Sequence, residues 1–163
     1  MGASISDKGG TDWILELSRM RKGSREIIEK ALKAGADILA DGFRNEIENL
    51  PTDERFVKEG EMKNGIRQIQ KQGLLDSFGI TPISCKDGVY DVHLGWDGYN
   101  GIVTNHWPKG QPNQMIARAV NVGTFYMRAT PFINRARSKY RKDAEQAMED
   151  TIAEEIGKIT NGG

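Results

Sequence analysis

The sequence predicts an α+β domain in which a long helix in the first half of the chain and a long C-terminal helix pack on a small antiparallel β-sheet. Three observations predict this. An apolar stripe of helical period runs over residues 24–47, and a second one runs over residues 132–159. Between them, two segments of period two flank an Asp-Gly pair. At 163 residues, the chain fits one domain with a core of its own.

The overall charge limits the class of partner. Lys plus Arg and Asp plus Glu both number 23, so the chain lacks the general basicity of an autonomous nucleic-acid binder. Cys85 is the only cysteine, which excludes an intrachain disulfide and fits a reducing cytoplasm. No apolar run approaches the roughly 18 residues that a membrane span requires, so we expect no membrane partner.

The two ends of the chain are rich in glycine. We expect residues 1–10, with three glycines, to form a flexible leader and residues 161–163 to form a flexible tail around a single domain over residues 11–160. Within that domain, Trp13, Ile14, Leu17 and Met20 recur at spacings of three and four. This spacing predicts a short first helix from Asp12 to Met20.

The first long helix is predicted to follow Ser24, which can cap it, and to end before Pro51. Its apolar stripe survives about six turns, while charged residues occupy the other side. The stripe consists of Ile27, Ile28, Ala31, Leu32, Gly35, Ile38, Leu39, Phe43 and Ile47. Small residues in this helix, such as Gly42, lower helix propensity but permit close approach by another element.

The middle of the chain changes from loop to helix to hairpin. Residues 51–65 are charged and turn-forming and predict a long surface loop. A short helix is predicted from Lys63 to Lys71, with Gly73 as its stop. Residues 80–85 and 89–94 then flank Lys86-Asp87-Gly88, which is typical of a β-hairpin.

The two faces of the predicted hairpin differ in polarity. Tyr90, Val92 and Leu94 share one face of the second strand, so one side of the sheet is expected to be buried and the other wet. Because proline has no N–H to donate, Pro82 indicates that the first strand lies at an edge of the sheet or begins after this residue. Residues 95–113 form a glycine- and proline-containing loop with three large aromatic residues and a possible strand at Ile102 to Asn105.

The segment from Met115 to Val122 is too short to assign, and Gly123 ends it. The C-terminal helix is predicted to start with Thr130 as its cap and Pro131 in its first position. One face is apolar: Phe132, Ile133, Ala136, Tyr140, Ala144, Met148, Ile152, Ile156 and Ile159.

The C-terminal helix carries its charges in the order opposite to that favoured by the helix dipole. Cations lie in its first half, at Arg135, Arg137, Lys139, Arg141 and Lys142. Carboxylates lie in its second half, at Asp143, Glu145, Glu149, Asp150, Glu154 and Glu155. Two interpretations are open. The basic end can pair with the acidic flank of a neighbouring copy, or the charges simply form a solvated face.

No set of residues predicts catalysis, a cofactor or a metal. His93 and His106 are the only histidines and are well separated, which fits neither a usual zinc site nor a Cys-His nucleophile. The segment starting at Asp97 lacks the ligand count of a calcium loop. Glycine-rich phosphate loops are missing as well. We therefore expect a protein that is not an enzyme.

After the first long helix, several short motifs follow one another along the chain: Gly-Leu-Leu-Asp-Ser-Phe at residues 73–78, the hairpin, the Val122-Gly123-Thr124 turn, and Pro-Phe-Ile-Asn-Arg-Ala at residues 131–136. This order of motifs resembles the minor tail, or neck, family of long-tailed bacteriophages. The resemblance covers roughly residues 12 to 158. The chain departs from the family in Asn121-Val122, which replaces a usual Glu-Phe, in Gln72 and Arg135, and in the enlarged 95–113 loop.

This resemblance implies a non-enzymatic virion component at the head-tail junction, of the head-tail joining or tail-completion type. It implies a homo-oligomeric ring around the DNA channel, sixfold or twelvefold, that contacts head-connector and tail proteins. DNA would pass through the channel without sequence-specific binding. The protein would occupy the host cytoplasm during assembly.

We predict the assembly surfaces from the loop aromatics and the charge split. One surface carries Trp96, Tyr99, Trp107, Arg135, Arg137 and Arg141, and the complementary one carries Glu149, Glu154 and Glu155. The alternative from another class is a nucleic-acid-binding module that uses the basic helix at residues 135–142.

Overall fold

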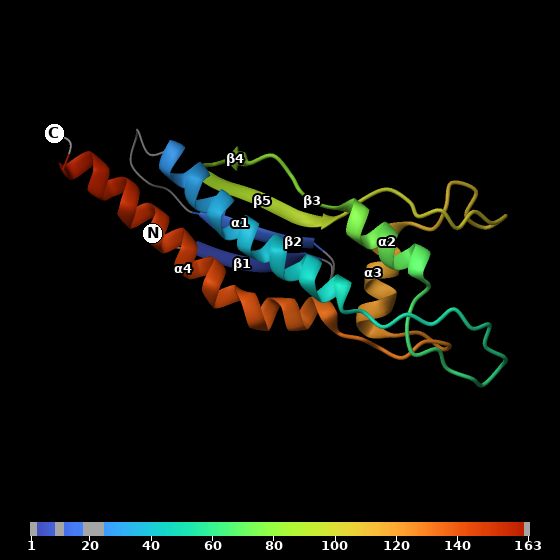
Figure 1. Cartoon of the computed structure of the whole chain (residues 1–163). Coiled ribbons are helices and arrows are strands. Elements are labelled where there is room, and N and C mark those ends of the chain that lie inside the picture. Colours follow the sequence, from blue (N-terminus) through green and yellow to red (C-terminus); the bar gives the residue numbers. More distant parts are fainter. Residues whose placement is uncertain (1–2, 9–11, 18–24, 162–163) are drawn as a thin grey trace.

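The computed structural model describes residues 3–8, 12–17 and 25–161, with side chains from residue 25 onward (Figure 1). The α+β prediction is confirmed. In chain order the elements are β1 (Ala3–Lys8), β2 (Asp12–Leu17), α1 (Arg25–Glu48), α2 (Gln68–Ser77), β3 (Phe78–Ile80), β4 (Ser84–Lys86), β5 (Val89–Trp96), α3 (Asn113–Val122) and α4 (Phe132–Asn161).

The sheet is antiparallel and is built around β5. One edge of β5 pairs with β2, which pairs in turn with β1, and the other edge pairs with β3 and β4. The register places Phe78 opposite Trp96 and Cys85 opposite Tyr90. Asp87 and Gly88 have positive φ values of 53° and 79°, as a tight hairpin turn between β4 and β5 requires. The predicted hairpin is confirmed.

The start of the chain differs from the sequence-based expectation. The helix predicted from Asp12 to Met20 is wrong over residues 12–17, which form β2; residues 18–20 lie outside the described residues. Ala3–Lys8, expected within a flexible leader, form β1. A short apolar run fits either period, and here pairing with β5 decides between them.

The two long helices are confirmed and lie antiparallel to each other. α1 crosses one face of the sheet, and α4 runs alongside α1 (Figure 1). The start of α1 lies beside the end of α4, where Lys30 Nζ is 3.0 Å from Glu155 Oε2. At the other end Arg135 Nε is 3.3 Å from Glu46 Oε2. Ser24, the expected cap, lies outside the described residues.

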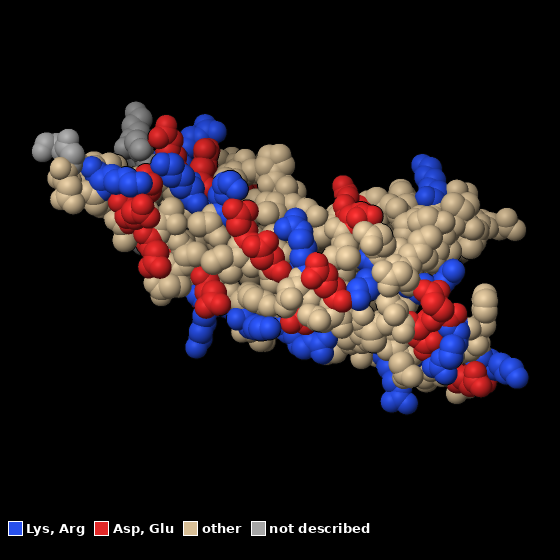
Figure 2. All heavy atoms as spheres, in the orientation of Figure 1, with Lys and Arg blue, Asp and Glu red and all other residues tan. Residues whose placement is uncertain are grey.

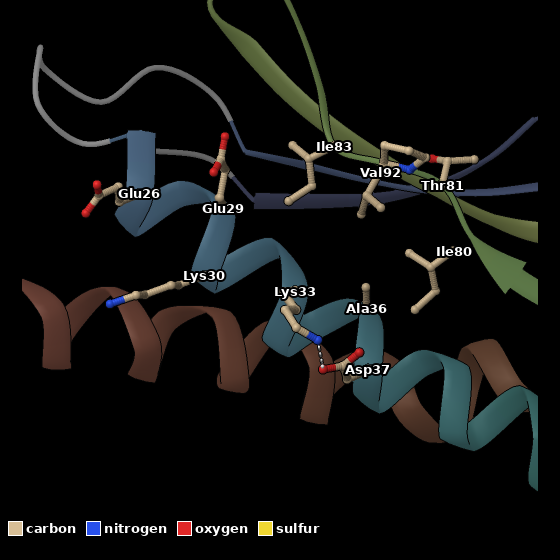
Figure 3. Close-up of a pocket in the computed structure, with 11 residues that line it drawn as sticks. Glu26, Glu29, Lys30, Lys33, Ala36, Asp37, Ile80, Thr81, Ile83 and Val92 are labelled. Carbon is tan, nitrogen blue, oxygen red and sulfur yellow. Dashed lines mark hydrogen bonds and ion pairs between the residues drawn. The ribbon is translucent and has the colours of Figure 1, made fainter.

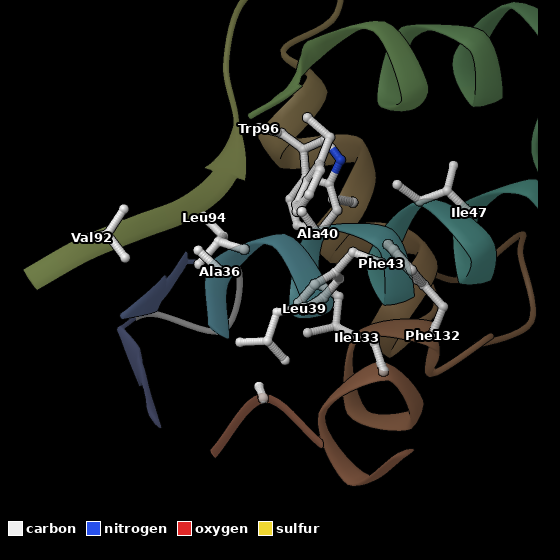
Figure 4. Close-up of a cluster of buried hydrophobic side chains, with 14 of the residues drawn as sticks. Ala36, Leu39, Ala40, Phe43, Ile47, Val92, Leu94, Trp96, Phe132 and Ile133 are labelled. Carbon is white, nitrogen blue, oxygen red and sulfur yellow. The ribbon is translucent and has the colours of Figure 1, made fainter. Parts of the chain in front are cut away.

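Four aromatic side chains form the centre of the core where the sheet meets both helices (Figure 4). The ring of Phe43 lies 5.4 Å from that of Phe78 and 5.9 Å from that of Trp96, centroid to centroid. The Trp96 ring lies 5.8 Å from the Phe132 ring at the start of α4. The Phe43–Trp96 and Trp96–Phe132 pairs meet edge to face and the Phe43–Phe78 pair is tilted, and together these contacts join α1, β3, β5 and α4.

The sequence predicted that Gly73 ends a helix. This prediction is wrong, because Gly73 lies in the middle of α2. A β-carbon at this position would lie 2.7 Å from Asn113 Oδ1 and 3.0 Å from the β-carbon of Asn100. Glycine is therefore present because α2 packs closely against the start of α3 and the loop before it. The helix itself begins at Gln68, after the Arg67 N–H donates to Gln70 Oε1 at 2.9 Å.

The chain reverses between α3 and α4. Gly123 ends α3 as predicted, with a φ of 81° and its N–H bonded to the Ala119 carbonyl at 2.8 Å. Thr130 was the predicted cap of α4. In the structure the Ile133 N–H in the first turn of α4 donates a hydrogen bond to Asn121 Oδ1 at 3.1 Å, and not to Thr130. The strand proposed at residues 102–105 is absent, since these described residues are irregular.

Candidate assembly surfaces

The three loop aromatics predicted to contact partners have different environments. Trp96 is only 5% exposed and belongs to the core, so its assignment to a contact surface was wrong. Tyr99 is exposed. Trp107 is half-buried, with the His106 ring 4.6 Å away edge to face. The loop that carries both projects past α2 and α3, at the edge of the molecule opposite α4 (Figure 1).

Two of the cations in the first half of α4 pair with carboxylates of the same chain. Arg135 pairs with Glu46 of α1, and Arg141 Nε lies 2.9 Å from Glu145 Oε1 one turn along the same helix. Arg137 is half-buried. Lys and Arg side chains nevertheless gather along the lower edge of the molecule over the first half of α4 (Figure 2).

The acidic end of α4 also has intrachain partners. Glu155 accepts hydrogen bonds from Lys30 and Lys158, and these bonds lower the pKa of its carboxyl. Glu154 lies 3.3 Å from Lys158, whereas Glu149 is exposed. Because α1 runs antiparallel to α4, it supplies a carboxylate to the basic end and a lysine to the acidic end. The reversed charge order therefore does not require a neighbouring copy.

Among the side chains that the structure describes, the most exposed large apolar ones lie elsewhere, on a surface that we call the loop tip. Phe56 and Phe125 are fully exposed, at 101% and 102%, and Tyr126 is 58% exposed. They come from two segments, residues 51–65 and the turn after α3. The residues that line this surface are Arg55, Phe56, Val57, Lys58, Glu59, Gly60, Glu61, Lys63, Phe125 and Tyr126.

Backbone hydrogen bonds join the two segments of the loop tip. The Lys63 N–H donates to the Tyr126 carbonyl at 2.7 Å, and the Arg128 N–H donates to the Lys63 carbonyl at 3.0 Å. At the base of the loop, the Asp53 N–H donates to the Ile66 carbonyl at 2.8 Å. Gly65 passes so close to Pro51 that any β-carbon on it would overlap the Pro51 carbonyl oxygen. The phenyl rings thus project from a braced frame.

Asp53 closes this frame with its side chain, which is almost buried. Its carboxylate accepts hydrogen bonds from Arg55 Nη2 at 2.7 Å, Arg55 Nε at 2.9 Å and the Asn64 N–H at 3.0 Å. The Arg55 guanidinium, followed by the Asn64 amide, holds the pKa of the Asp53 carboxyl far below its usual range. The carboxylate ties the two ends of the loop together in the charged form.

We expect Asp53→Asn to loosen the loop at neutral pH. The folded-state pKa is depressed, so the stabilisation is complete above the unfolded-chain pKa of about 4 and is lost as pH falls through the folded-state value. Deuterium exchange of residues 53–64 is expected to be faster in the variant at pH 7, and the difference in urea midpoint from wild type is expected to shrink toward pH 3. A difference that is independent of pH would contradict this.

A second uncovered apolar surface lies between α1 and the edge of the sheet, and we call it the α1 groove (Figure 3). It has a volume of about 530 Å³. Ile80, Ile83 and Val92 face the helix across it, and Lys33 Nζ pairs with Asp37 Oδ2 at 3.0 Å on its rim. The lining residues are Glu26, Glu29, Lys30, Lys33, Ala36, Asp37, Ile80, Thr81, Pro82, Ile83 and Val92.

Among the described residues, no group of three or more His, Cys, Asp or Glu side chains converges as metal ligands, and none of the helices is both long and apolar enough to span a membrane. Neither family models, nor curated proteins, nor solved structures yield a match to this chain.

Sequence reasoning missed the loop tip. Phe56 sits alone in a charged loop, and Phe125-Tyr126 follows a Gly-Thr turn, so neither segment continues an apolar stripe. Their position outside any periodic apolar pattern was the feature of the sequence that could have indicated exposed side chains. The hairpin residues of the α1 groove were predicted as strand, but their position over α1 depends on how the sheet packs on the helix.

Proposed function

We propose that this chain is a structural virion protein at the head-tail junction of a long-tailed bacteriophage, which assembles as a ring around the DNA channel. The observation that carries the proposal is the presence of two unlike uncovered apolar surfaces, the loop tip and the α1 groove. Exposed apolar patches of this kind mark sites of protein association. Two unlike patches favour contacts that join copies head to tail.

The position of the two surfaces leaves both of them free to contact other copies. The α1 groove lies beside the first half of α1, whereas the loop tip follows the end of that helix (Figure 1). About 11 residues of helix separate Asp37 from the end of α1, which corresponds to roughly 16 Å at 1.5 Å per residue. The braced loop cannot fold back over this distance, so each surface remains available to another copy.

The motifs at residues 73–78, 122–124 and 131–136 give the more specific part of the proposal, because their order resembles that of the neck family. The formal net charge of zero suits the wall of a channel through which DNA must slide. We propose head-connector and tail proteins as the neighbours of the ring.

The nucleic-acid-binding alternative has weaker support. Of the cations in the basic helix, Arg135 and Arg141 are engaged with carboxylates of the same chain. Any phosphate contact would have to compete with these pairs. A salt titration distinguishes the two functions, because binding through phosphate contacts falls steeply as salt rises. We expect no sequence-specific DNA binding at physiological salt.

Disruption of the gene in its phage tests the proposed function. We expect lysates of the mutant to contain filled heads and separate tails, since each part assembles without the joint. Supply of the intact gene from a plasmid is the control and is expected to restore joined particles. Complete, infectious virions from the mutant would contradict the proposal, and so would a block before heads or tails form.

A further inference from the structure

We propose that the contact between neighbouring copies is formed by the loop tip of one copy and the α1 groove of the next, with Phe56 and Phe125 inserted between α1 and the β3–β4 edge. This inference rests on the proposed function only in that copies of the chain assemble. It identifies the two surfaces that meet, and it differs from the sequence-based prediction, which placed the contact on α4 and on the aromatic residues of the 95–113 loop.

The apolar surfaces are complementary in form. Phe56 and Phe125 project fully from the loop tip, while the α1 groove is a hollow with apolar side chains on its floor and sheet side. Its volume of about 530 Å³ falls within the range of roughly 300–1,000 Å³ that is typical of pockets that bury a ligand. Aromatic side chains each bury roughly 150–250 Å² when covered, and they dominate contacts of this kind.

The charges are compatible with this contact. The loop tip is balanced in charge, because Asp53 holds Arg55: Arg55, Lys58 and Lys63 stand against Asp53, Glu59 and Glu61. The α1 groove carries three carboxylates and two cations: Glu26, Glu29 and Asp37 against Lys30 and Lys33. Groove against groove would bring two surfaces with an excess of carboxylates together, whereas the balanced tip meets no such repulsion in the groove. The occupant that fits the groove is therefore a second copy of this chain.

The loop tip is also ordered before any contact forms. Asp53, Gly65 and the backbone bonds of Lys63 fix the frame that carries the two phenyl rings. A braced surface loses little conformational freedom on association, so more of the gain from covering the rings goes into binding.

Cys85 provides a reporter at the groove. It is exposed on β4, two residues after Ile83 of the groove, and lies opposite Tyr90 in the pairing of β4 with β5. Tyr90 lies on the same face of β5 as Val92, which lines the groove. Since Cys85 is the only cysteine, a second one introduced at the loop tip can form an intermolecular disulfide where tip and groove meet.

The test is oxidation of Phe125→Cys and, separately, Phe56→Cys under mild conditions. Each chain then has one cysteine at the tip and one at the groove, so we expect a ladder of covalent oligomers on a non-reducing gel that collapses on reduction. Phe125→Cys combined with Cys85→Ser is expected to give no ladder. The matched control is Ser138→Cys, an exposed site on α4 that keeps Cys85, and it is expected to run as a single chain on the non-reducing gel.

Three results would overturn the inference. Covalent dimers from Phe125→Cys/Cys85→Ser would show that the loop tips of two copies contact each other. A ladder of oligomers from Ser138→Cys would place the contact between copies on α4. A lack of cross-linking from both tip variants, together with unchanged oligomer mass for Phe56→Ser/Phe125→Ser, would exclude the tip from the contact. In each case the gene disruption can still separate heads from tails, so failure of the inference is distinct from failure of the proposed function.

Discussion

Phe43→Ala is expected to lower the free energy of unfolding by about 3–5 kcal/mol. The Phe43 side chain is fully buried and touches aromatic rings from β3 and β5. Its removal leaves a cavity between α1 and the sheet that the rigid neighbours cannot fill. Equilibrium urea denaturation, followed by circular dichroism at a concentration at which the chain is monomeric, measures the change.

The chain offers a matched control for this prediction. Phe125→Ala removes the same atoms from a side chain that is fully exposed, so it is expected to change stability by no more than about 0.5 kcal/mol. If the two variants unfold at the same urea concentration, the aromatic cluster at Phe43 does not stabilise the fold as the structure indicates.

Gly42→Ala is expected to destabilise the protein by about 1–3 kcal/mol, against the trend for a helix interior. Alanine favours the helix by roughly 1 kcal/mol over glycine. At this position, however, a β-carbon would lie 2.5 Å from Cγ of the Tyr140 ring, which packs flat on the glycine. The ring is also held by its hydroxyl, which accepts a hydrogen bond from Asn45 Nδ2 at 3.1 Å.

A double-mutant cycle tests this cause directly. In a Tyr140→Ala background the obstacle is gone, so Gly42→Ala is expected to become stabilising by about 1 kcal/mol. Gly157→Ala, in α4 with no neighbouring atom near its β-carbon position, serves as the control and is expected to stabilise the wild-type protein slightly. Stabilisation by Gly42→Ala with Tyr140 present would mean that α1 and α4 are not so closely packed.

The elements with long or unambiguous periods could be predicted from the sequence. The stripes of α1 and α4 continue for many turns, and Asp87-Gly88 fixes the hairpin. β2 could not be predicted, because its six residues satisfy helical spacing equally well and the decision comes from pairing with β5. The position of Gly73 inside a helix could not be predicted either. Glycine is needed there because Asn113 approaches closely, and this contact is visible only in the structure.

The candidate surfaces were harder to predict than the fold. Trp96 and Tyr99 are three residues apart in one glycine-rich stretch, yet one lies in the core and the other faces solvent. Strand β5 continues to Trp96 and directs it inward, which composition alone does not reveal. The charge split along α4 was visible in the sequence, but its pairing with α1 depends on the antiparallel arrangement of the two helices.

A cryo-electron microscopy reconstruction of the neck of the phage particle tests the central claim most directly. The account predicts a closed ring of copies between head and tail, each with Phe56 and Phe125 seated between α1 and the β3–β4 edge of its neighbour. A neck whose density is fully accounted for by other proteins, or a purified particle that lacks this chain, would contradict it.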